Sequence, residues 1–422
     1  MPYFPVKSPQ TSAGRVSRRS FLGGLGAAAA AAAVTCAPTA LGGLDDEAYW
    51  RQIRRQFPLR SGFILMNAAN LCPSPIQVSE AVRAYTRDID ADASFQNRSK
   101  YAVYLDRATG LLARYMGADS DEIAIVRNTT EGNNQVVAGL ELGPEDEVLL
   151  WDENHPSNNL SWDVAARRRG FGVRRVTTGA DPTDSEQLFA AFAETVTPRT
   201  RVLSFSHVSN VTGVALPVAE LCAFARDRDI LTLIDGAQTF GVHEVDLHAI
   251  GCDFYTGSAH KWFMGPKEGG LLYVRRTSAR RLWPSVVGVG WSEELEGAGR
   301  FATLGQRDDA MYASMIEAVG FLESVGNARI EARVRSLAAS LKSGILTSVK
   351  GAKLITPEDE ALSGGVVVFS VAGWDHGAVF ERLYEDHRIA GAQIGPEWLR
   401  LCPHVYNTRA EVTRVVDVLA AI

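Results

Sequence analysis

ILTLIDGAQTFGVHEVDLHAIGCDFYTGSAHKW, residues 230–262, is the stretch of this sequence from which the fold can be argued. Its first run, residues 230–234, is short, apolar and branched, which is typical of a buried parallel strand. Asp235 follows directly. A second run, residues 252–256, predicts another buried strand, and Lys261 comes shortly after it. Because ligands bind outside the carboxyl ends of strands in α/β sheets, we expect Asp235 and Lys261 to face one pocket.

A lysine and a carboxylate in one pocket suit pyridoxal 5'-phosphate (PLP). The amine forms a Schiff base with the aldehyde, and the carboxylate keeps the pyridine nitrogen protonated so that the ring accepts electrons. We assign these roles to Lys261 and Asp235. Either residue alone is better explained as a surface lysine or a strand-end turn residue. Gln238, Ser258 and His260 add polar groups at short spacing, which favours a site.

Four pieces of this region also resemble a known family when they are taken together. They are IDGAQ at 234–238, SAHKW at 258–262, the pair Gly265 and Pro266, and the expected strand at 270–274. As a set they resemble the cofactor site of class V aminotransferases of PLP fold type I, in the branch similar to isopenicillin N epimerase. The resemblance runs from Asn67 to the C-terminus.

The resemblance implies an α/β fold in two domains. The large PLP-binding domain, residues 41–285, is expected to hold a mostly parallel seven-stranded sheet, and residues 286–422 a smaller α+β domain. It also implies a homodimer. The chain has 422 residues, 46% of them hydrophobic, and a net charge of −6. This composition is typical of a globular protein and gives no basic footprint for nucleic acid.

The five cysteines are widely spaced, with no CxxC and no zinc pattern, so no metal site is predicted. Cys72 and Cys402 flank segments of the expected pocket. A disulfide between them in an oxidising compartment is therefore a hypothesis.

The N-terminus predicts an export signal over residues 1–40. SRRSFL at 17–22 resembles the twin-arginine signal, and a Gly/Ala-rich apolar stretch and small residues follow it. The alternatives are a disordered tail with a chance arginine pair and, at Cys36, a lipidation site. The signal implies the twin-arginine export machinery as a partner and a folded protein in the periplasm or outside the cell.

Residues 122–126 are expected to form the first strand of the large domain, and a helix opens directly after it. Its first residues include Thr129 and Thr130, whose hydroxyls and free backbone N–H groups suit a phosphate. A simple N-cap at Thr130 is the alternative. The resemblance, in which this turn holds the PLP phosphate together with Ser258 and His260, favours the phosphate site.

The loops after the next strands carry further residues that the resemblance assigns. His155 is similar to a histidine that lies flat on the pyridine ring; by itself it would be a solvated loop histidine. Asn210 and Gln238 correspond to residues that hydrogen-bond the phenolic oxygen of the cofactor. A loop asparagine in left-handed geometry is the alternative for Asn210.

Three assignments concern the neighbouring subunit and the substrate. Gln306 stands where relatives carry a threonine that reaches the phosphate of the other subunit, and Gln306 also has a donor. Arg400 corresponds to an arginine that binds the substrate carboxylate, a task that suits its planar fork; a surface salt bridge is the alternative. Asn67 lies in a loop that enters the site near the substrate, or in a simple turn.

Residues 389–395 hold no cysteine, although desulfurases place a nucleophilic cysteine near here. The sequence therefore argues against persulfide chemistry by that route. We expect an enzyme that transaminates or deaminates an amino acid or an amino-acid side group of an exported peptide-like metabolite, as similar periplasmic enzymes do for pyoverdine siderophores. Alternatives are a carbon–sulfur lyase or desulfurase-like enzyme, an amino-acid epimerase, and a PLP-binding protein without catalysis.

Overall fold

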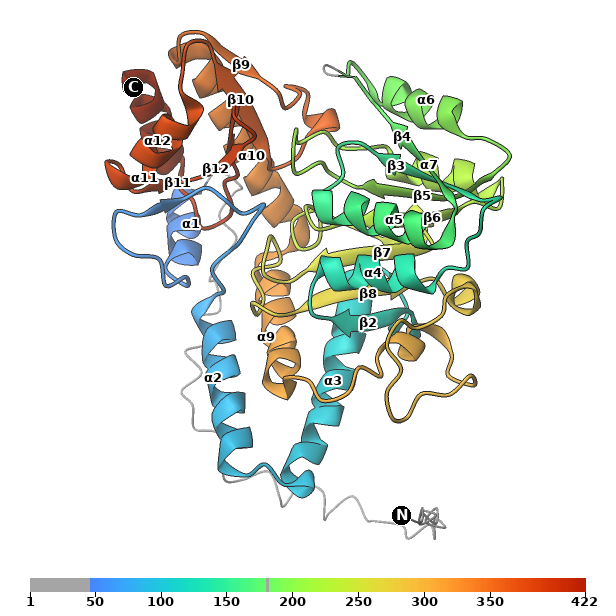
Figure 1. Ribbon diagram of the computed structural model, residues 1–422. Helices are drawn as coiled ribbons and strands as arrows, with labels where there is room; N and C mark the ends of the chain where they lie inside the picture. Colours follow the sequence, from blue (N-terminus) through green and yellow to red (C-terminus); the bar gives the residue numbers. More distant parts are fainter. Residues whose placement is uncertain (1–45, 180–181) are drawn as a thin grey trace. The chain divides into compact units, whose positions relative to one another are not determined.

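The computed structural model describes residues 46–179 and 182–422 (Figure 1). The predicted export signal, residues 1–40, lies outside these ranges and stays a prediction. The described residues belong to one compact unit. Within the described ranges no helix is both long enough and apolar enough to cross a lipid bilayer.

A seven-stranded sheet forms the centre of this unit, with the order β2-β8-β7-β6-β5-β3-β4. Strands β3 to β7 run parallel to one another. Strand β8 is antiparallel to both of its neighbours, β7 and β2. No helix lies between β7 and β8, so the chain returns antiparallel, since a parallel return needs a longer crossover. The prediction of a mostly parallel seven-stranded sheet is confirmed. The strands are β2 (Ile123–Val126), β3 (Glu147–Trp151), β4 (Gly172–Val176), β5 (Thr200–Ser206), β6 (Leu231–Asp235), β7 (Phe254–Ser258) and β8 (Gly270–Val274).

Helices cover both faces of the sheet, which is why its central strands are continuously apolar. Along β3, Val148 and Leu150 pack in the cluster that includes α4 and α5, whereas Leu149 and Trp151 pack on the opposite face with α6, α7 and α8. Alternate side chains of one strand thus enter two separate cores. The helices are α4 (Thr129–Gly139), α5 (Pro156–Arg169), α6 (Ser185–Thr195), α7 (Val218–Arg226) and α8 (Leu247–Ile250).

The C-terminal part has its own antiparallel sheet, with the order β12-β13-β10-β9, and its own hydrophobic core. A short parallel pair, β1 with β11, joins the N-terminal segment to it. These contacts place β13 and the segment around Asn67 next to each other. The elements are β1 (Ile64–Leu65), β9 (Ala352–Leu354), β10 (Val367–Val371), β11 (Ile389–Ala390), β12 (Ala392–Ile394), β13 (Trp398–Leu401), α10 (Asn327–Ser348), α11 (His376–Glu385) and α12 (Arg409–Ala421).

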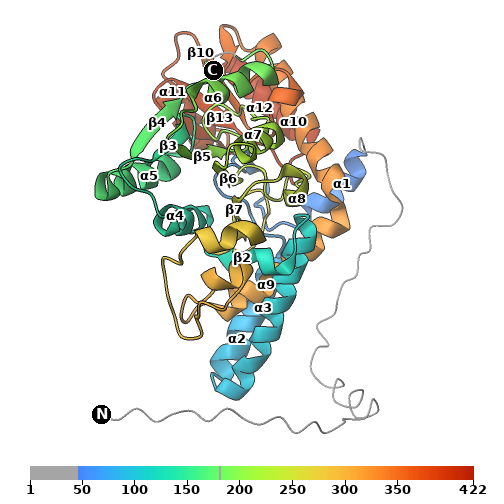
Figure 2. The ribbon, with the colours of Figure 1, turned by 90° about the vertical axis from the view of Figure 1, so that its right-hand side faces the viewer.

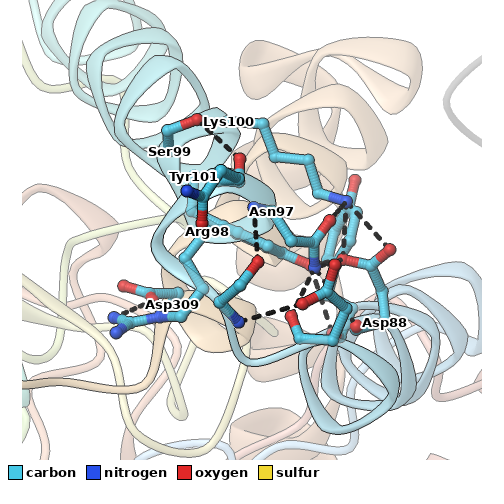
Figure 3. Close-up of polar contacts among 11 residues, drawn as sticks. Asp88, Asn97, Arg98, Ser99, Lys100, Tyr101 and Asp309 are labelled. Carbon is cyan, nitrogen blue, oxygen red and sulfur yellow. Dashed lines mark hydrogen bonds and ion pairs between the residues drawn. The ribbon is translucent and has the colours of Figure 1, made fainter.

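Three long helices, α2 (Ile76–Ala91), α3 (Phe95–Tyr115) and α9 (Asp309–Val325), lie side by side (Figures 1 and 2). Helix α3 begins at Phe95, because the Ser94 side chain caps it by accepting from the Asn97 backbone N–H. Asp88 pairs with Lys100 across the turn between α2 and α3, and Arg98 pairs with Asp309 of α9 (Figure 3). Polar contacts therefore fix the end of this helical group.

One predicted strand changes its boundaries. The second quoted strand spans 254–258 rather than 252–256, because the Asp253 carboxylate accepts from the backbone N–H and hydroxyl of Thr232 before the strand begins. Ser258 is therefore the last residue of β7.

The domain boundary at 285/286 stays a prediction. Helix α9, on the C-terminal side of this boundary, packs against α2 and α3. The remaining helices are α1 (Glu47–Arg54) and the 3-10 turns η1 (Ser120–Glu122), η2 (Arg276–Arg281), η3 (Gly297–Phe301) and η4 (Glu360–Leu362).

The disulfide between Cys72 and Cys402 is not formed. Both are free, buried thiols. The Cys72 sulfur lies near the Ala68 carbonyl and the Tyr406 hydroxyl instead. Burial raises the pKa of Cys72 to about 12, which suppresses the thiolate needed for exchange.

Candidate active site

A cavity of about 450 Å³ lies at the carboxyl ends of the central strands. Its walls come from β5, β6 and β7, from the first turns of α4 and α5, and from β13. The structure brings ten of the twelve predicted site residues to these walls: Thr129, Thr130, His155, Asn210, Asp235, Gln238, Ser258, His260, Lys261 and Arg400.

Asp235 and Lys261 face this cavity as expected. Asp235 ends β6, is 4% exposed, and accepts hydrogen bonds from the Asn133 side-chain amide at 3.0 Å and the Ala237 backbone N–H at 3.0 Å. Gly236 permits the turn that follows, because a Cβ there would lie 1.9 Å from the Tyr255 ring. The backbone thus fixes where the carboxylate sits.

Lys261 is half-buried, and among the described residues its amine makes no hydrogen bond or ion pair. Burial lowers the pKa of Lys261; Asp235 opposes this effect, and Arg400 adds to it. More of the amine is therefore uncharged near neutral pH, as a Schiff-base lysine requires. The neighbouring Lys267 differs, because its amine donates to the Cys72 carbonyl and the Ser74 hydroxyl.

The first turn of α4 forms an anion cradle. Asn128, not Thr130, is the N-cap, and its side chain accepts from the Glu131 backbone N–H at 3.0 Å. Thr129 is buried, with its backbone N–H and its hydroxyl both within hydrogen-bond distance of the Ser258 hydroxyl. Because the N–H groups of a first helical turn point toward the N-terminus, where the helix dipole favours negative charge, the turn suits a phosphate.

His155 caps α5 from the loop after β3. Its Nδ1 accepts from the Ser157 backbone N–H at 3.2 Å, which assigns the ring proton of the neutral form to Nε2. Burial lowers the pKa of His155, and the nearby Lys261 lowers it further. Burial also lowers the pKa of His260, to about 4, with Lys261 adding to the effect. Both rings are neutral near pH 7.

The side chains of Asn210 and Gln238 differ in how many hydrogen-bond partners they already have within the protein. The side-chain oxygen of Asn210 is buried and has no partner in the described chain, so it fits a bound group. Gln238 is held from both ends, because its amide donates to the Ala69 carbonyl and its oxygen accepts from the Trp262 indole at 2.7 Å. Gln238 keeps a second amide hydrogen for a ligand.

Arg400 lies on β13 and is 5% exposed. It donates to the Asn210 carbonyl at 2.8 Å and to the Asn67 side-chain oxygen at 3.2 Å, while its Nε has no partner in the described chain. The alternative of a surface salt bridge is wrong, since the residue is buried and its partners are neutral. A buried guanidinium without a carboxylate suits an anionic ligand.

Two predicted residues lie outside these walls. Asn67 spans from Arg400 to the Gly391 carbonyl, so it holds Arg400 rather than lining the cavity. Gln306 accepts from Arg98 and donates to the Arg307 carbonyl, and it lines two other cavities of the same chain. Its contact with the phosphate of a second subunit stays a prediction.

Sequence reasoning assigned no role to several residues of the walls, among them the buried amides Asn133 and Asn158. Asn158 is 1% exposed; its oxygen accepts from the Ser204 hydroxyl, and its amide nitrogen has no partner among the described residues. The available signal was weak: asparagine favours caps and turns, so one at a buried position of a helix needs a partner that explains it.

The residues of this cavity fit PLP. The α4 turn and Ser258 provide a phosphate cradle, Lys261 an unpaired, half-buried amine, and Asp235 a fixed carboxylate. The Asn210 oxygen and the Arg400 Nε are buried polar atoms that still lack partners within the described ranges. Unpartnered polar atoms around one cavity indicate a ligand that completes them.

Comparison with known proteins supports this assignment. Residues 64–415 match the family model "Aminotransferase class-V". The isopenicillin N epimerase of Streptomyces clavuligerus is 32% identical over 394 residues, which cover 88% of this chain and 98% of the relative. A probable cysteine desulfurase of Methanothermobacter thermautotrophicus is 34% identical over 246 residues, covering 56% of this chain and 59% of the relative.

Solved structures agree with the fold. The cystine C–S lyase C-DES in complex with its product cysteine persulfide aligns with a TM-score of 0.80 at 25% identity, covering 86% of this chain and 99% of that chain. A mutant of C-DES, with glycine covalently linked to the PLP cofactor, aligns with the same TM-score and identity over 87% of this chain and 98% of its own. Because the family model spans most of the chain, this protein belongs to the class V aminotransferase family of PLP-dependent fold type I enzymes.

Proposed function

We propose that this enzyme cleaves the carbon–sulfur bond of a cysteine-like amino acid by β-elimination. The observation that carries the proposal is that the described cavity walls hold one amine base beside two histidines, of which His260 is predicted to hold the phosphate and His155 to stack on the cofactor ring. Lys261 is their only lysine, and they hold no cysteine, tyrosine or glutamate. In its neutral form His155 has its Nδ1 lone pair engaged by the Ser157 N–H and a proton on Nε2, so it presents no free lone pair. Elimination needs a single base at the α-carbon.

The proposed reaction follows from this arrangement. PLP supplies the electron-accepting ring that stabilises negative charge at the α-carbon. Arg400 binds the substrate carboxylate, and Lys261 takes the α-proton after the substrate amine has displaced it. The C–S bond then breaks, and the sulfur leaves with the electron pair as a thiol, or as a persulfide from cystine. Water converts the remaining aminoacrylate to pyruvate and ammonia.

Two further observations support elimination over desulfurase chemistry. The segment from 389 to 395 holds no cysteine, and β11 and β12 lie within it. An enzyme persulfide formed at this segment therefore has no acceptor sulfur. The similar structure of C-DES is described as a cystine C–S lyase, which fits elimination.

Epimerisation is the second candidate, and the similarity to isopenicillin N epimerase along nearly its full length favours it. Epimerisation needs a second group that exchanges a proton with the α-carbon. His155, whose Nε2 carries a proton in the neutral form, is the residue to test as the proton donor for that role. Transamination of an exported peptide-like metabolite stays a prediction that the same experiment decides.

The test uses the purified holoenzyme without a keto acid. L-cystine, cysteine conjugates, siderophore-type peptides and, as matched controls, L-alanine and Lys261→Ala enzyme are compared. We expect pyruvate, ammonia and persulfide from L-cystine, with the visible cofactor band retained and no product from L-alanine. Accumulated pyridoxamine phosphate would establish transamination instead, and inverted amino acid would establish epimerisation.

We also propose that the enzyme is a homodimer that is exported folded by the twin-arginine pathway. The signal-like sequence at 17–22 supports export, and the position of Gln306, outside its own cavity, supports a role in a second subunit. Sedimentation at micromolar concentration tests the dimer, and a monomer that retains full cofactor affinity would contradict it. Fractionation of cells with the wild-type and Arg18→Lys/Arg19→Lys chains tests export.

A further inference from the structure

Asn133 is a buried amide whose two ends are both engaged. It belongs to α4, one turn after the anion cradle, and is 2% exposed. Its amide nitrogen donates to Asp235 Oδ2 at 3.0 Å, and its oxygen accepts from the Thr256 hydroxyl at 2.7 Å. The three side chains form a line from β7 through α4 to β6.

The amide has one acceptable orientation. In the flipped form its oxygen would face the Asp235 carboxylate, and two acceptors would meet without a hydrogen between them. The Thr256 hydroxyl, 0% exposed, then directs its hydrogen to the Asn133 oxygen. This line therefore has a fixed direction, with the donors pointing toward Asp235.

A close approach of α4 to β7 makes the line possible. At Gly132, a Cβ would lie 2.8 Å from the Thr256 methyl group. Glycine at this position lets the helix lie close enough for Asn133 to span from Thr256 to Asp235.

We propose that Asn133 is a positioning residue for the cofactor, acting through Asp235 with Thr256 behind it. This inference rests on PLP at Asp235 and is independent of the reaction type. The amide donor and the Ala237 N–H hold the carboxylate as an anion in one rotamer. The remaining carboxylate lone pairs would then be available to hold the pyridine nitrogen of PLP. Without Asn133 the carboxylate would be buried with one donor fewer and free to turn.

The experiment compares the full-length holoenzyme with the Asn133→Leu, Thr256→Val and double variants. Three quantities are measured: the PLP dissociation constant, the pH dependence of the visible cofactor band, and the thermal unfolding of the cofactor-free protein. We expect Asn133→Leu to weaken PLP binding roughly ten- to hundredfold, as for the loss of a hydrogen bond to a charged group, and to shift the pH profile. Thr256→Val should act in the same direction with a smaller effect, and the double variant should match Asn133→Leu.

A merely structural role gives a different result. In that case Asn133→Leu and Thr256→Val would lower the unfolding temperature while the PLP dissociation constant and the pH profile stayed at wild-type values. If Asn133→Leu does not fold, Thr256→Val, which keeps the side-chain shape, decides the question by the same readouts. If the wild-type protein carried no cofactor on Lys261, that result would contradict the proposed cofactor site itself.

Discussion

At the scale of single residues, Arg400 has the most direct prediction. Its guanidinium is buried with neutral partners only, so it remains available to a substrate carboxylate. Removing one partner of a buried charge pair costs roughly 2–5 kcal/mol. We therefore expect Arg400→Ala to lower kcat/KM for the best amino acid at least thirtyfold, mainly through KM, and Arg400→Lys to recover part of it.

The control for Arg400 lies in the substrate. A decarboxylated or amidated analogue should be used equally well by wild-type and Arg400→Ala enzyme. An equal loss for substrates with and without the carboxylate would contradict the assignment.

Glu153 gives a pH prediction for the loop that carries His155. Burial raises its pKa from 4.5 to about 6, although the Thr212 hydroxyl donates to its carboxylate. The folded state thus binds more protons than the unfolded state between pH 4.5 and 6, so the stability from this group is lost as the pH rises through that window. Above it, Glu153→Gln should be more stable than wild type by about 2 kcal/mol. Urea unfolding at pH 4 and pH 8 measures this; a difference that does not change with pH would contradict it.

The role of a residue could be predicted from the sequence when its position depends on nearby residues, and not when its partners lie far away along the chain. Lys261 and Asp235 follow apolar runs that mark strand ends, so sequence alone places them at one sheet edge. Asn133 could not be predicted this way, because Thr256, which orients its amide, lies 123 residues along the chain. Asn67 was assigned to the substrate because its contact with Arg400 is created only when β13 lies beside the N-terminal segment.

At the scale of elements, the contact between α4 and β7 carries a prediction. Gly132→Ala would place a methyl 2.8 Å from the stiff Thr256 side chain, and overpacking of this kind costs about 1–3 kcal/mol. We expect lower stability and weaker PLP binding together. Gly110, inside α3, is the matched control, because a Cβ there would meet no atom within 4 Å; Gly110→Ala should leave binding unchanged and raise stability slightly. Equal behaviour of the two variants would contradict the packing argument.

An element could be predicted from the sequence where its own residues show it. It could be predicted less well where its ends depend on contacts with neighbouring elements. The apolar runs indicated β2, β6 and β8 because strands covered on both faces are apolar throughout. The first turns of α3 are polar instead, and Arg98 and Lys100 are held there by contacts with Asp309 and Asp88. Those contacts depend on how α2 and α9 pack.

At the scale of the whole molecule, we predict that the N-terminal segment divides at the start of α1 into a dispensable and an essential part. Residues before Glu47 precede the first helix, whereas in α1 Trp50 is fully buried and Arg54 pairs with Glu411 at 2.7 Å. Deletion of residues 1–45 should leave PLP affinity and unfolding temperature unchanged. Deletion of residues 1–55 should cost about 3 kcal/mol or more, as for loss of a buried tryptophan. A large loss with the shorter deletion would contradict this division.

The measurement that tests the central claim most directly locates the cofactor on the chain. Borohydride reduction of the holoenzyme fixes PLP to the lysine that holds it, and peptide mass spectrometry identifies that lysine. We predict a pyridoxyl group on Lys261 at one per chain, absent from Lys261→Ala. Lys267 is the informative neighbour, because its amine is already engaged by Cys72 and Ser74. A modified Lys267, or an unchanged adduct in Lys261→Ala, would contradict the proposed site.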